Sequence, residues 1–232
     1  MCALASVPVL DHVVLAARSL DAIDDALAEL GLTAGSGRAI PGSGLSNRMV
    51  AVGTQLLELH YPDGTPVAED GPPYALTQRR ALQAHPELTL VPVAFVVRYP
   101  TEDSLRAASE QAGYPVLEMP PEPPNGGAYL LGGLGAGFER PWLPAFIHWA
   151  QSPHLPPALV DDHDRGPNEG RLTLDVSGPP DELRAWCGSA PEGVTVEEGV
   201  AGPLRVWIHR SEGTQAVGLP PAGAPGLLLA PS

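Results

Sequence analysis

Apolar and polar positions in the first quarter of the chain follow two different periods. Residues 8–16 (PVLDHVVLA) are an apolar run that is interrupted by one polar pair, which predicts a strand. The next segment predicts a helix, because its apolar residues share one helical face: Leu20, Ile23, Leu27 and Leu30. Ser19 is a candidate N-cap and Gly31 a stop signal. With a Gly-rich passage and further strands after it, residues 8–62 are predicted to form a β-α-β-β-β unit.

The same order of elements returns in residues 88–150. A strand (LTLVPVAFVVRYP) is followed by a helix that begins after Thr101 and ends at Gly113, and then by further strand candidates that end in PAFIHWA. A connection with a short helical piece (YALTQRRALQAH) joins the two halves. The halves share the order of their elements more than their letters, so residues 8–150 are predicted to hold two paired modules that form one domain.

The C-terminal part repeats the pattern once more, in shortened form. Residues 171–219 contain a strand (RLTLDVS), a short helix (PPDELRAWCG) and segments that alternate like antiparallel strands. Residues 151–170 are rich in Pro and Asp and are interpreted as a linker, and residues 220–232 as a loosely docked tail. The predicted fold class is therefore α+β, with tandem β-α-β-β-β modules and an extra C-terminal half module.

Composition narrows the classes of partner. The chain has 27 acidic and 13 basic residues and a formal net charge of −14, which argues against nucleic acid and anionic membranes as partners. No run approaches the roughly 20 apolar residues of a membrane span, and the first residues lack the basic region of a signal peptide. Two cysteines form no disulfide framework. These features favour a cytoplasmic location. Separately, the sequence has no Lys and is rich in Pro and Gly, which indicates a bacterial genome of high GC content.

Three predicted strands carry residues of a metal-binding type beside apolar neighbours. These residues are His12 in the first strand, Glu58 in TQLLELHYP and His148 in PAFIHWA. Alternate residues of a strand share a face, so each of them lies opposite its immediate apolar neighbours. A single strand histidine usually hydrogen-bonds only a backbone carbonyl, but three such residues at matching positions favour a common site.

These motifs resemble the vicinal oxygen chelate superfamily, which is built from tandem β-α-β-β-β modules and includes glyoxalase I and the bleomycin-binding proteins. LDHVVLAARSLD resembles its first strand, where a histidine binds the metal, and LLELHYP its fourth, where Glu is a common ligand. Two longer passages resemble the glyoxalase-like subfamily: GSGLSNRMVAVGTQLLELHYP and LPAFIHWAQSPHLPPA. Members of this subfamily carry Gly-x-Gly-x-x-Asn followed by a Leu-Glu strand, and later a Pro-Phe-x-Ile-x-Trp strand followed by Pro-His. The resemblance covers roughly residues 8 to 215 and includes an additional C-terminal half module.

The resemblance implies a metal site formed by His12, Glu58 and His148. Two imidazoles and one carboxylate suit a divalent ion such as Zn, Ni, Fe, Mn or Co, and three ligands leave positions open for water and substrate. This sequence departs from the subfamily in two places. Ser46 stands where a histidine often precedes the Asn, and His148 stands where an acidic residue or Gln is common. The fifth strand offers only apolar residues at its matching place.

Other polar residues near these strands are weaker candidates. His60 lies two residues after Glu58 on the same face, and it is predicted to act as a general base or as a partner of the metal ligands. Asn47, Arg48 and His154 are candidates for substrate binding, since Asn and Arg follow the Gly-rich passage and His154 lies after the last strand of the second module. The alternative for each is an ordinary role in a turn or at a solvated rim.

The first hypothesis is a glyoxalase-like, divalent-metal-dependent enzyme that acts on a small oxygenated substrate as a lyase, isomerase or dioxygenase. The second is a metal-free protein of the same fold that binds and sequesters a small molecule. The third is an interaction domain whose cleft is filled by its own tail, GLLLAPS. The sequence leaves open whether the cleft forms within one chain or across a homodimer.

Overall fold

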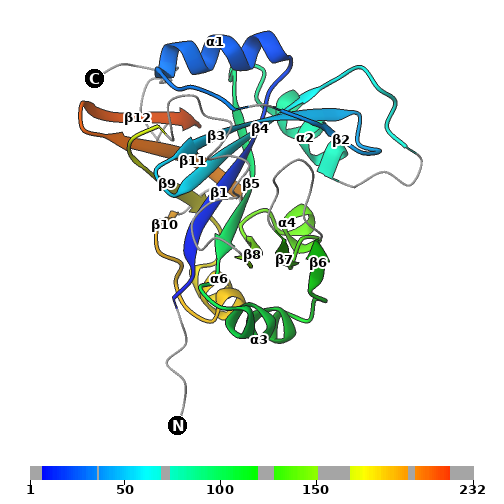
Figure 1. Cartoon of the computed structure of the whole chain (residues 1–232), viewed down its shortest axis with the longest axis vertical. Coiled ribbons are helices and arrows are strands. Elements are labelled where there is room, and N and C mark those ends of the chain that lie inside the picture. The colour runs from blue at the N-terminus through cyan, green and yellow to red at the C-terminus, as the bar shows by residue number, and fades with distance from the viewer. Residues whose placement is uncertain are drawn as a thin grey trace.

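Two β-sheets, one of eight strands and one of four, carry the described part of the chain (Figure 1). The computed structural model describes residues 7–35, 37–68, 74–119, 128–150, 168–197 and 202–219. His154, the tail 220–232 and most of the predicted linker lie outside these residues. None of the helices in the described ranges is long and apolar enough to cross a membrane.

The first module begins with β1 (Val9–Ala16) and α1 (Leu20–Leu30). The Ser19 hydroxyl accepts a hydrogen bond from the amide of Ala22, and Gly31 ends the helix in the left-handed conformation at φ 63°. The strands β2 (Ala39–Ile40), β3 (Leu45–Val52) and β4 (Gln55–Pro62) complete the module. Helix α2 (Tyr74–Ala84) follows and leads into the second module, as its sequence predicted.

The second module has the same order of elements. It contains β5 (Val91–Arg98), α3 (Glu102–Ala112), β6 (Leu117–Met119), β7 (Tyr129–Gly132) and β8 (Ala145–Trp149), with the short helix α4 (Ala136–Glu139) before β8. The strand order of the eight-stranded sheet is β2-β3-β4-β1-β5-β8-β7-β6. Strands β1 and β5 pair antiparallel at its centre, and each has a parallel neighbour, β4 or β8, from its own module. The prediction of an α+β fold with paired β-α-β-β-β modules is confirmed.

The C-terminal unit contains β9 (Arg171–Ser177), α6 (Pro180–Cys187), β10 (Val194–Glu197), β11 (Gly202–Arg210) and β12 (Gly213–Gly218). Its strand order, β10-β9-β11-β12, differs from that of the modules. The first strand β9 pairs in parallel with the second strand β10, whereas β1 pairs in parallel with the fourth strand β4. The unit therefore shares the order of elements of a module but not its sheet topology.

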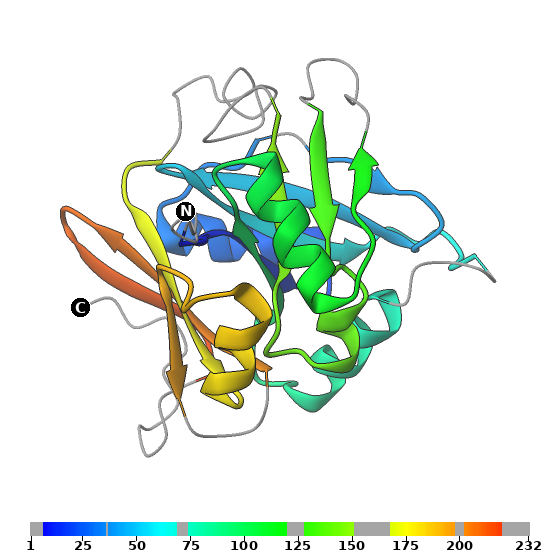
Figure 2. The same ribbon diagram turned by 90° about the horizontal axis from the view of Figure 1, so that it is seen from below.

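The two sheets share one hydrophobic core. In this core, one face of the large sheet packs against the buried sides of α1, α3 and α6 and against apolar residues of β9 and β11. Figure 2 shows these helices and strands around the large sheet. Phe146 is fully buried in it, with its ring centroid 5.4 Å from both Tyr99 and Trp186. Gln55 also links the sheets, because its amide nitrogen donates to Leu10 O and Leu172 O at 3.0 Å each. One face of β1, β4 and β5 is thus covered. On the opposite face, α2 packs against part of β1 and β5, and the rest carries the site.

Replacing Thr101 with alanine is expected to lower the free energy of unfolding by about 1 kcal/mol. The Thr101 hydroxyl accepts from the Ser104 amide at 3.2 Å, and the Ser104 hydroxyl accepts from the Thr101 amide at 3.3 Å, which forms a capping box. Thermal unfolding of Thr101→Ala beside Thr101→Ser measures this contribution, because serine keeps the hydroxyl. Equal destabilisation by both substitutions would contradict the capping explanation.

Candidate small-molecule site

The face of the large sheet opposite the main core, here called the inner face, collects polar residues from β1, β3 and β4. Asn47 on β3 pairs with His60 on β4, and Val14 on β1 pairs with Glu58. Because alternate residues share a face, His12 lies on the same side of the sheet as these residues. Leu57 and Leu59 point the other way, into the main core. We define the inner polar cluster by five residues: Asp11, His12, Asn47, Glu58 and His60.

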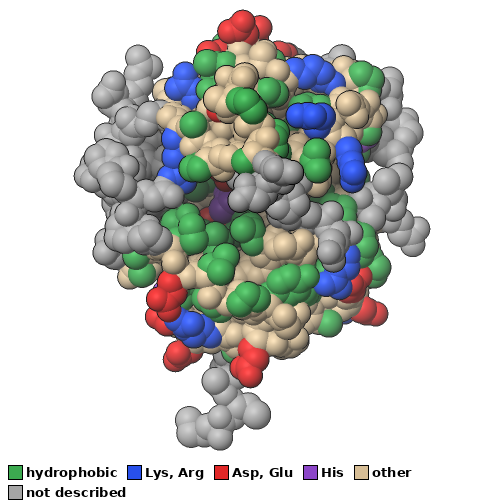
Figure 3. Space-filling model, turned by 90° about the vertical axis from the view of Figure 1, so that its right-hand side faces the viewer, with side chains coloured by type: hydrophobic (Ala, Val, Ile, Leu, Met, Phe, Trp, Pro, Cys, Tyr) green, Lys and Arg blue, Asp and Glu red, His purple; other side chains and the backbone are tan. Residues whose placement is uncertain are grey.

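Glu58 lies at the centre of this cluster. Its Oε1 accepts a hydrogen bond from Asn47 Nδ2 at 2.8 Å and lies 2.9 Å from His60 Nε2, while its Oε2 lies 3.8 Å from His12 Nε2. Burial would raise the pKa of Glu58, but the His60 and His12 imidazoles and the Asn47 hydrogen bond outweigh burial and hold this pKa well below its usual range. The carboxylate is therefore ionised at neutral pH. Figure 3 shows a histidine side chain in a hollow of the surface, with hydrophobic side chains beside it.

His60 is held from its other side by helix α2. Its Nδ1 pairs with Gln78 Nε2, and both side chains are buried. An amide nitrogen can only donate, so His60 Nδ1 is the acceptor and the ring hydrogen lies on Nε2, toward Glu58. His60 was predicted as a general base or as a partner of the metal ligands, and the structure places it in contact with Glu58. Its role as a general base remains a prediction.

His12 is oriented by its neighbour Asp11. Asp11 Oδ1 lies 2.8 Å from His12 Nδ1, so His12 Nε2 faces Glu58. Burial would lower the pKa of His12, but the hydrogen bond to Asp11 and the negative charges of Asp11 and Glu58 outweigh burial and raise it. The 3.8 Å between His12 Nε2 and Glu58 Oε2 exceeds a hydrogen-bond distance. Both atoms thus face a common point without binding each other directly.

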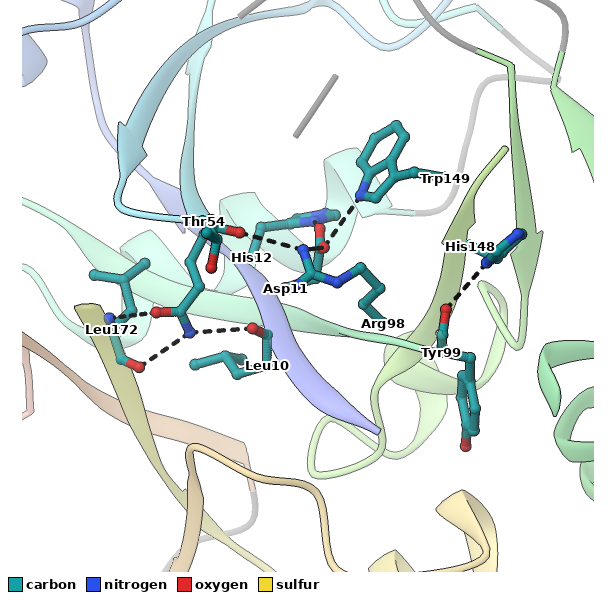
Figure 4. A network of polar contacts seen from close by, with 10 residues as sticks. Leu10, Asp11, His12, Thr54, Arg98, Tyr99, His148, Trp149 and Leu172 are labelled. Carbon is teal, nitrogen blue, oxygen red and sulfur yellow. Dashed lines mark hydrogen bonds and ion pairs between the residues drawn. The ribbon is translucent and has the colours of Figure 1, made fainter. Parts of the chain in front are cut away.

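The second module lines the remainder of the inner face with mostly apolar residues. Val96, Ala145, Ile147 and Trp149 form a buried cluster against which Tyr129 packs. The Tyr129 and Trp149 rings have centroids 5.0 Å apart. Burial raises the pKa of Tyr129, and the negative charge of Glu58 raises this pKa by a smaller amount. Arg98 and Trp149 reach the first module through Asp11 (Figure 4). The inner face is therefore polar on one module and apolar on the other.

The structure brings His12 and Glu58 together, but it places His148 elsewhere. His148 Nδ1 lies 3.1 Å from the carbonyl oxygen of Tyr99, and the two residues lie apart from His12 (Figure 4). The inner positions of β8 belong to Ile147 and Trp149, and alternation turns His148 to the opposite face. The strand pattern identified the two faces of β8 but did not show which of them is the inner one.

The predicted substrate-binding residues also separate. Asn47 lies on the inner face and contacts Glu58. Arg48, its neighbour in β3, pairs with the core residue Leu59 and so points away from that face. His154 lies outside the described residues. Asn47 is therefore the predicted binding residue that the structure places in the cluster.

The donor groups at hand do not fit a metal centre with three protein ligands. Within the described ranges, no group of three or more His, Cys, Asp or Glu side chains has the arrangement needed to hold a metal ion. The inner positions of β5 and β8 are occupied by Val96, Ala145 and Ile147, which have no donor atoms. The predicted ligand set thus supplies His12 and Glu58 at this face, without His148.

Three residues of the site were not predicted: Asp11, Arg98 and Trp149. The sequence gives one signal for Asp11, which is its position directly before His12 in the interrupted apolar run. Strict alternation assigns Asp11 and His12 to opposite faces, and only the local irregularity of β1 brings both to one side. Arg98 ends β5 and Trp149 ends β8, so both mark the edge of the inner face.

Comparison with known proteins agrees with this architecture. A family model described as a glyoxalase-like domain matches residues 10–186. No curated protein matches the sequence. A hypothetical protein from Staphylococcus aureus has a similar structure, with a TM-score of 0.52 and 10% identity over 85% of this chain and 88% of that one.

Smaller structures also align with part of the chain. Methylmalonyl-CoA epimerase from Mycobacterium tuberculosis aligns with a TM-score of 0.41 and 17% identity, over 64% of this chain and 91% of that one. The Streptomyces coelicolor methylmalonyl-CoA epimerase, in complex with 2-nitronate-propionyl-CoA, aligns with a TM-score of 0.41 and 15% identity, over 63% and 97%. These similarities concern the fold alone.

Proposed function

Since this chain belongs to the glyoxalase-like domain family, we propose that it binds a small oxygenated molecule at the inner polar cluster, with His12 and Glu58 as the groups that contact it. The fold and the family support a small-molecule enzyme or binding protein. The observation that carries the proposal is the convergence of His12 and His60 on Glu58, at a face whose other half is apolar. A ligand with an oxygenated end and an apolar body matches this division.

The charges of the cluster indicate which ligand atoms it would bind. With a raised pKa, His12 is available as an imidazolium that donates through Nε2, and Glu58 is an ionised acceptor. A carbonyl or carboxylate oxygen of the ligand would accept from His12, and a neighbouring hydroxyl would donate to Glu58 Oε2. Such charge-assisted hydrogen bonds are stronger than neutral ones. The ligand we propose therefore has oxygen atoms on adjacent carbons.

Divalent-metal-dependent chemistry of the lyase, isomerase or dioxygenase type is the second candidate. The observation that favours it is the Asp11–His12 pair, since a histidine that binds a metal usually donates its other ring nitrogen to a carboxylate. A three-ligand site would need one donor beyond those that the described residues bring together. Direct contact of the ligand with His12 and Glu58 is therefore the function that the described residues support best.

Ligand-induced stabilisation of the full chain tests the proposal. We expect a compound from a panel of the 2-hydroxy acids lactate, 2-hydroxyisocaproate and mandelate to raise the unfolding temperature in the presence of excess EDTA. At a ligand concentration of 100 times Kd, binding to the native state adds about 2.7 kcal/mol of stability. Parallel samples with Mn²⁺, Ni²⁺ or Zn²⁺ in place of EDTA test the second candidate. Stabilisation only in the metal samples would favour a metal site, and no stabilisation in any sample would contradict both.

A further inference from the structure

Asp11 is the residue through which three strands of the site are joined. Its side chain is buried, with 1% of the residue exposed, and its two oxygen atoms have three partners. Oδ1 lies 2.8 Å from His12 Nδ1, and Oδ2 accepts from Arg98 at 3.1 Å and from Trp149 Nε1 at 3.1 Å. The partners come from β1, β5 and β8, so the carboxylate ties the histidine of the first module to the second module (Figure 4).

An irregularity in β1 makes this arrangement possible. Leu10 pairs with Val97 and His12 pairs with Val96, so Asp11 has no partner position of its own on β5. Such an extra residue is a β-bulge, and bulges redirect side chains beside functional sites. Here the bulge turns Asp11 toward the same side of the sheet as His12, although the two are neighbours in sequence. Asp11 is not needed as an apolar contact, because Leu10 and Val13 already fill the core on the other face.

We propose that Asp11 is the positioning residue of the site: by accepting from Nδ1–H of His12, in the charged or the neutral ring, it keeps a hydrogen on Nδ1 and directs Nε2 at Glu58 and the ligand. The importance of this orientation rests on the proposed function, but the orientation itself belongs to the free protein. The hydrogen bond made by one ring nitrogen decides which nitrogen of a neutral imidazole carries the hydrogen. An ionised carboxylate can only accept, so the nitrogen that faces Asp11 must carry it. Arg98 and Trp149 both donate to Oδ2, which leaves Oδ1 for the imidazole.

The number of donors explains why a carboxylate is needed here. His12 Nδ1, Arg98 and Trp149 Nε1 all direct hydrogens at this side chain, and an ionised Asp has two accepting oxygens. Asparagine has one oxygen and one donor group, so either His12 or the Arg98 and Trp149 pair would face a donor. An Asp11→Asn substitution keeps the size of the side chain while it removes one acceptor. It is therefore the variant that separates positioning from packing.

The tautomer of His12 is measured directly by two-bond ¹H–¹⁵N correlation spectra of the full chain at alkaline pH, where the imidazole is neutral. The His12→Gln variant identifies the signals of His12 by their absence. We expect wild type to show the Nδ1–H form as the major species. In Asp11→Asn we expect the ratio of the two tautomers to move at least about tenfold toward Nε2–H, as loss of a charge-assisted hydrogen bond implies.

Trp149→Phe is the matched control, because it removes the indole donor to Oδ2 and leaves the Oδ1 contact with His12. Its tautomer ratio should stay close to that of wild type. A wild-type protein with the hydrogen on Nε2 would overturn the proposal, even if Asp11→Asn did not fold. An unchanged ratio in folded Asp11→Asn would overturn it as well. The measurement needs no ligand, so its outcome is independent of whether the panel of oxygenated compounds binds.

Discussion

In the Glu58→Gln variant, the affinity for the stabilising compound of the panel is expected to fall by about 10- to 100-fold, since a hydrogen bond to a charged group contributes about 1.5–3 kcal/mol. Glutamine keeps the shape of the side chain and one oxygen that can accept from Asn47. It removes the negative charge that faces His12 and the acceptor at Oε2 that a ligand hydroxyl would use. The loss is measured as the ligand concentration needed for half-maximal thermal stabilisation, with EDTA present.

His148→Gln is the control for this experiment. Like Glu58→Gln, this variant places glutamine at a polar position on a strand of the large sheet. His148, however, lies on the other face of β8 and forms a hydrogen bond with Tyr99 O. Its unfolding temperature is free to change, whereas its ligand-induced shift should match that of wild type. Loss of binding in His148→Gln with retention in Glu58→Gln would place the ligand away from the inner polar cluster. That result would contradict the proposed function.

The periodicity of apolar residues was sufficient to predict most of the fold. The helical spacing in 20–30 and the strand runs on either side gave the first module, and the same order gave the second. These local patterns do not determine which distant strands pair with each other. The C-terminal unit shows this, because its sequence predicted the order of its elements but not that β9 pairs with β10 and β11.

The site was predictable only in part, for a related reason. His12 and Glu58 could be placed on one face each by alternation, and parallel pairing of β1 with β4 then brings them together. Alternation divides the residues of a strand between two faces, but it does not show which face the core covers. His148 was therefore predicted to lie on the same face as His12 and Glu58. It also assumes an unbroken period of two. The bulge at Asp11 breaks that period, and so the most highly bonded residue of the cluster was not predicted.

The two modules have different roles at the inner face although they share a topology. The first supplies the inner polar cluster, and the second supplies Val96, Ala145, Ile147 and an aromatic pair. A symmetric site would carry donors on β5 and β8 to match those on β1 and β4. Polar links from the second module to the first are hydrogen bonds from Arg98 to Asp11 and Thr54 and from Trp149 to Asp11. The first module thus supplies most of the polar side chains of the inner face, and the second supplies most of its apolar ones.

A separate group of charges stabilises the C-terminal unit. Arg205 is buried, with 3% of the residue exposed, and its Nε lies 2.8 Å from Asp175 Oδ2. It also contacts Glu197 at 2.9 Å and donates to the carbonyl oxygen of Leu219 at 3.1 Å, while Trp207 Nε1 donates to Asp175 at 2.6 Å. Asp175 is itself 7% exposed, so its charge has little access to water. The pair therefore has a much larger consequence for stability than an exposed ion pair.

Replacing Arg205 with methionine is expected to lower the free energy of unfolding by about 3–5 kcal/mol, because Asp175 is left as a buried charge without its cationic partner. Thermal and denaturant unfolding of the full chain measures this change. Arg106→Met is the matched control, since Arg106 pairs with Glu102 and Glu118 at an exposed position and its loss should have no measurable effect. The double variant Arg205→Met, Asp175→Leu should recover most of the lost stability, because it removes the unpaired charge together with its partner. If Arg205→Met unfolds at the same temperature as Arg106→Met, the ion pair does not hold the four-stranded sheet, and the apolar residues of β9 and β11 are sufficient for its stability.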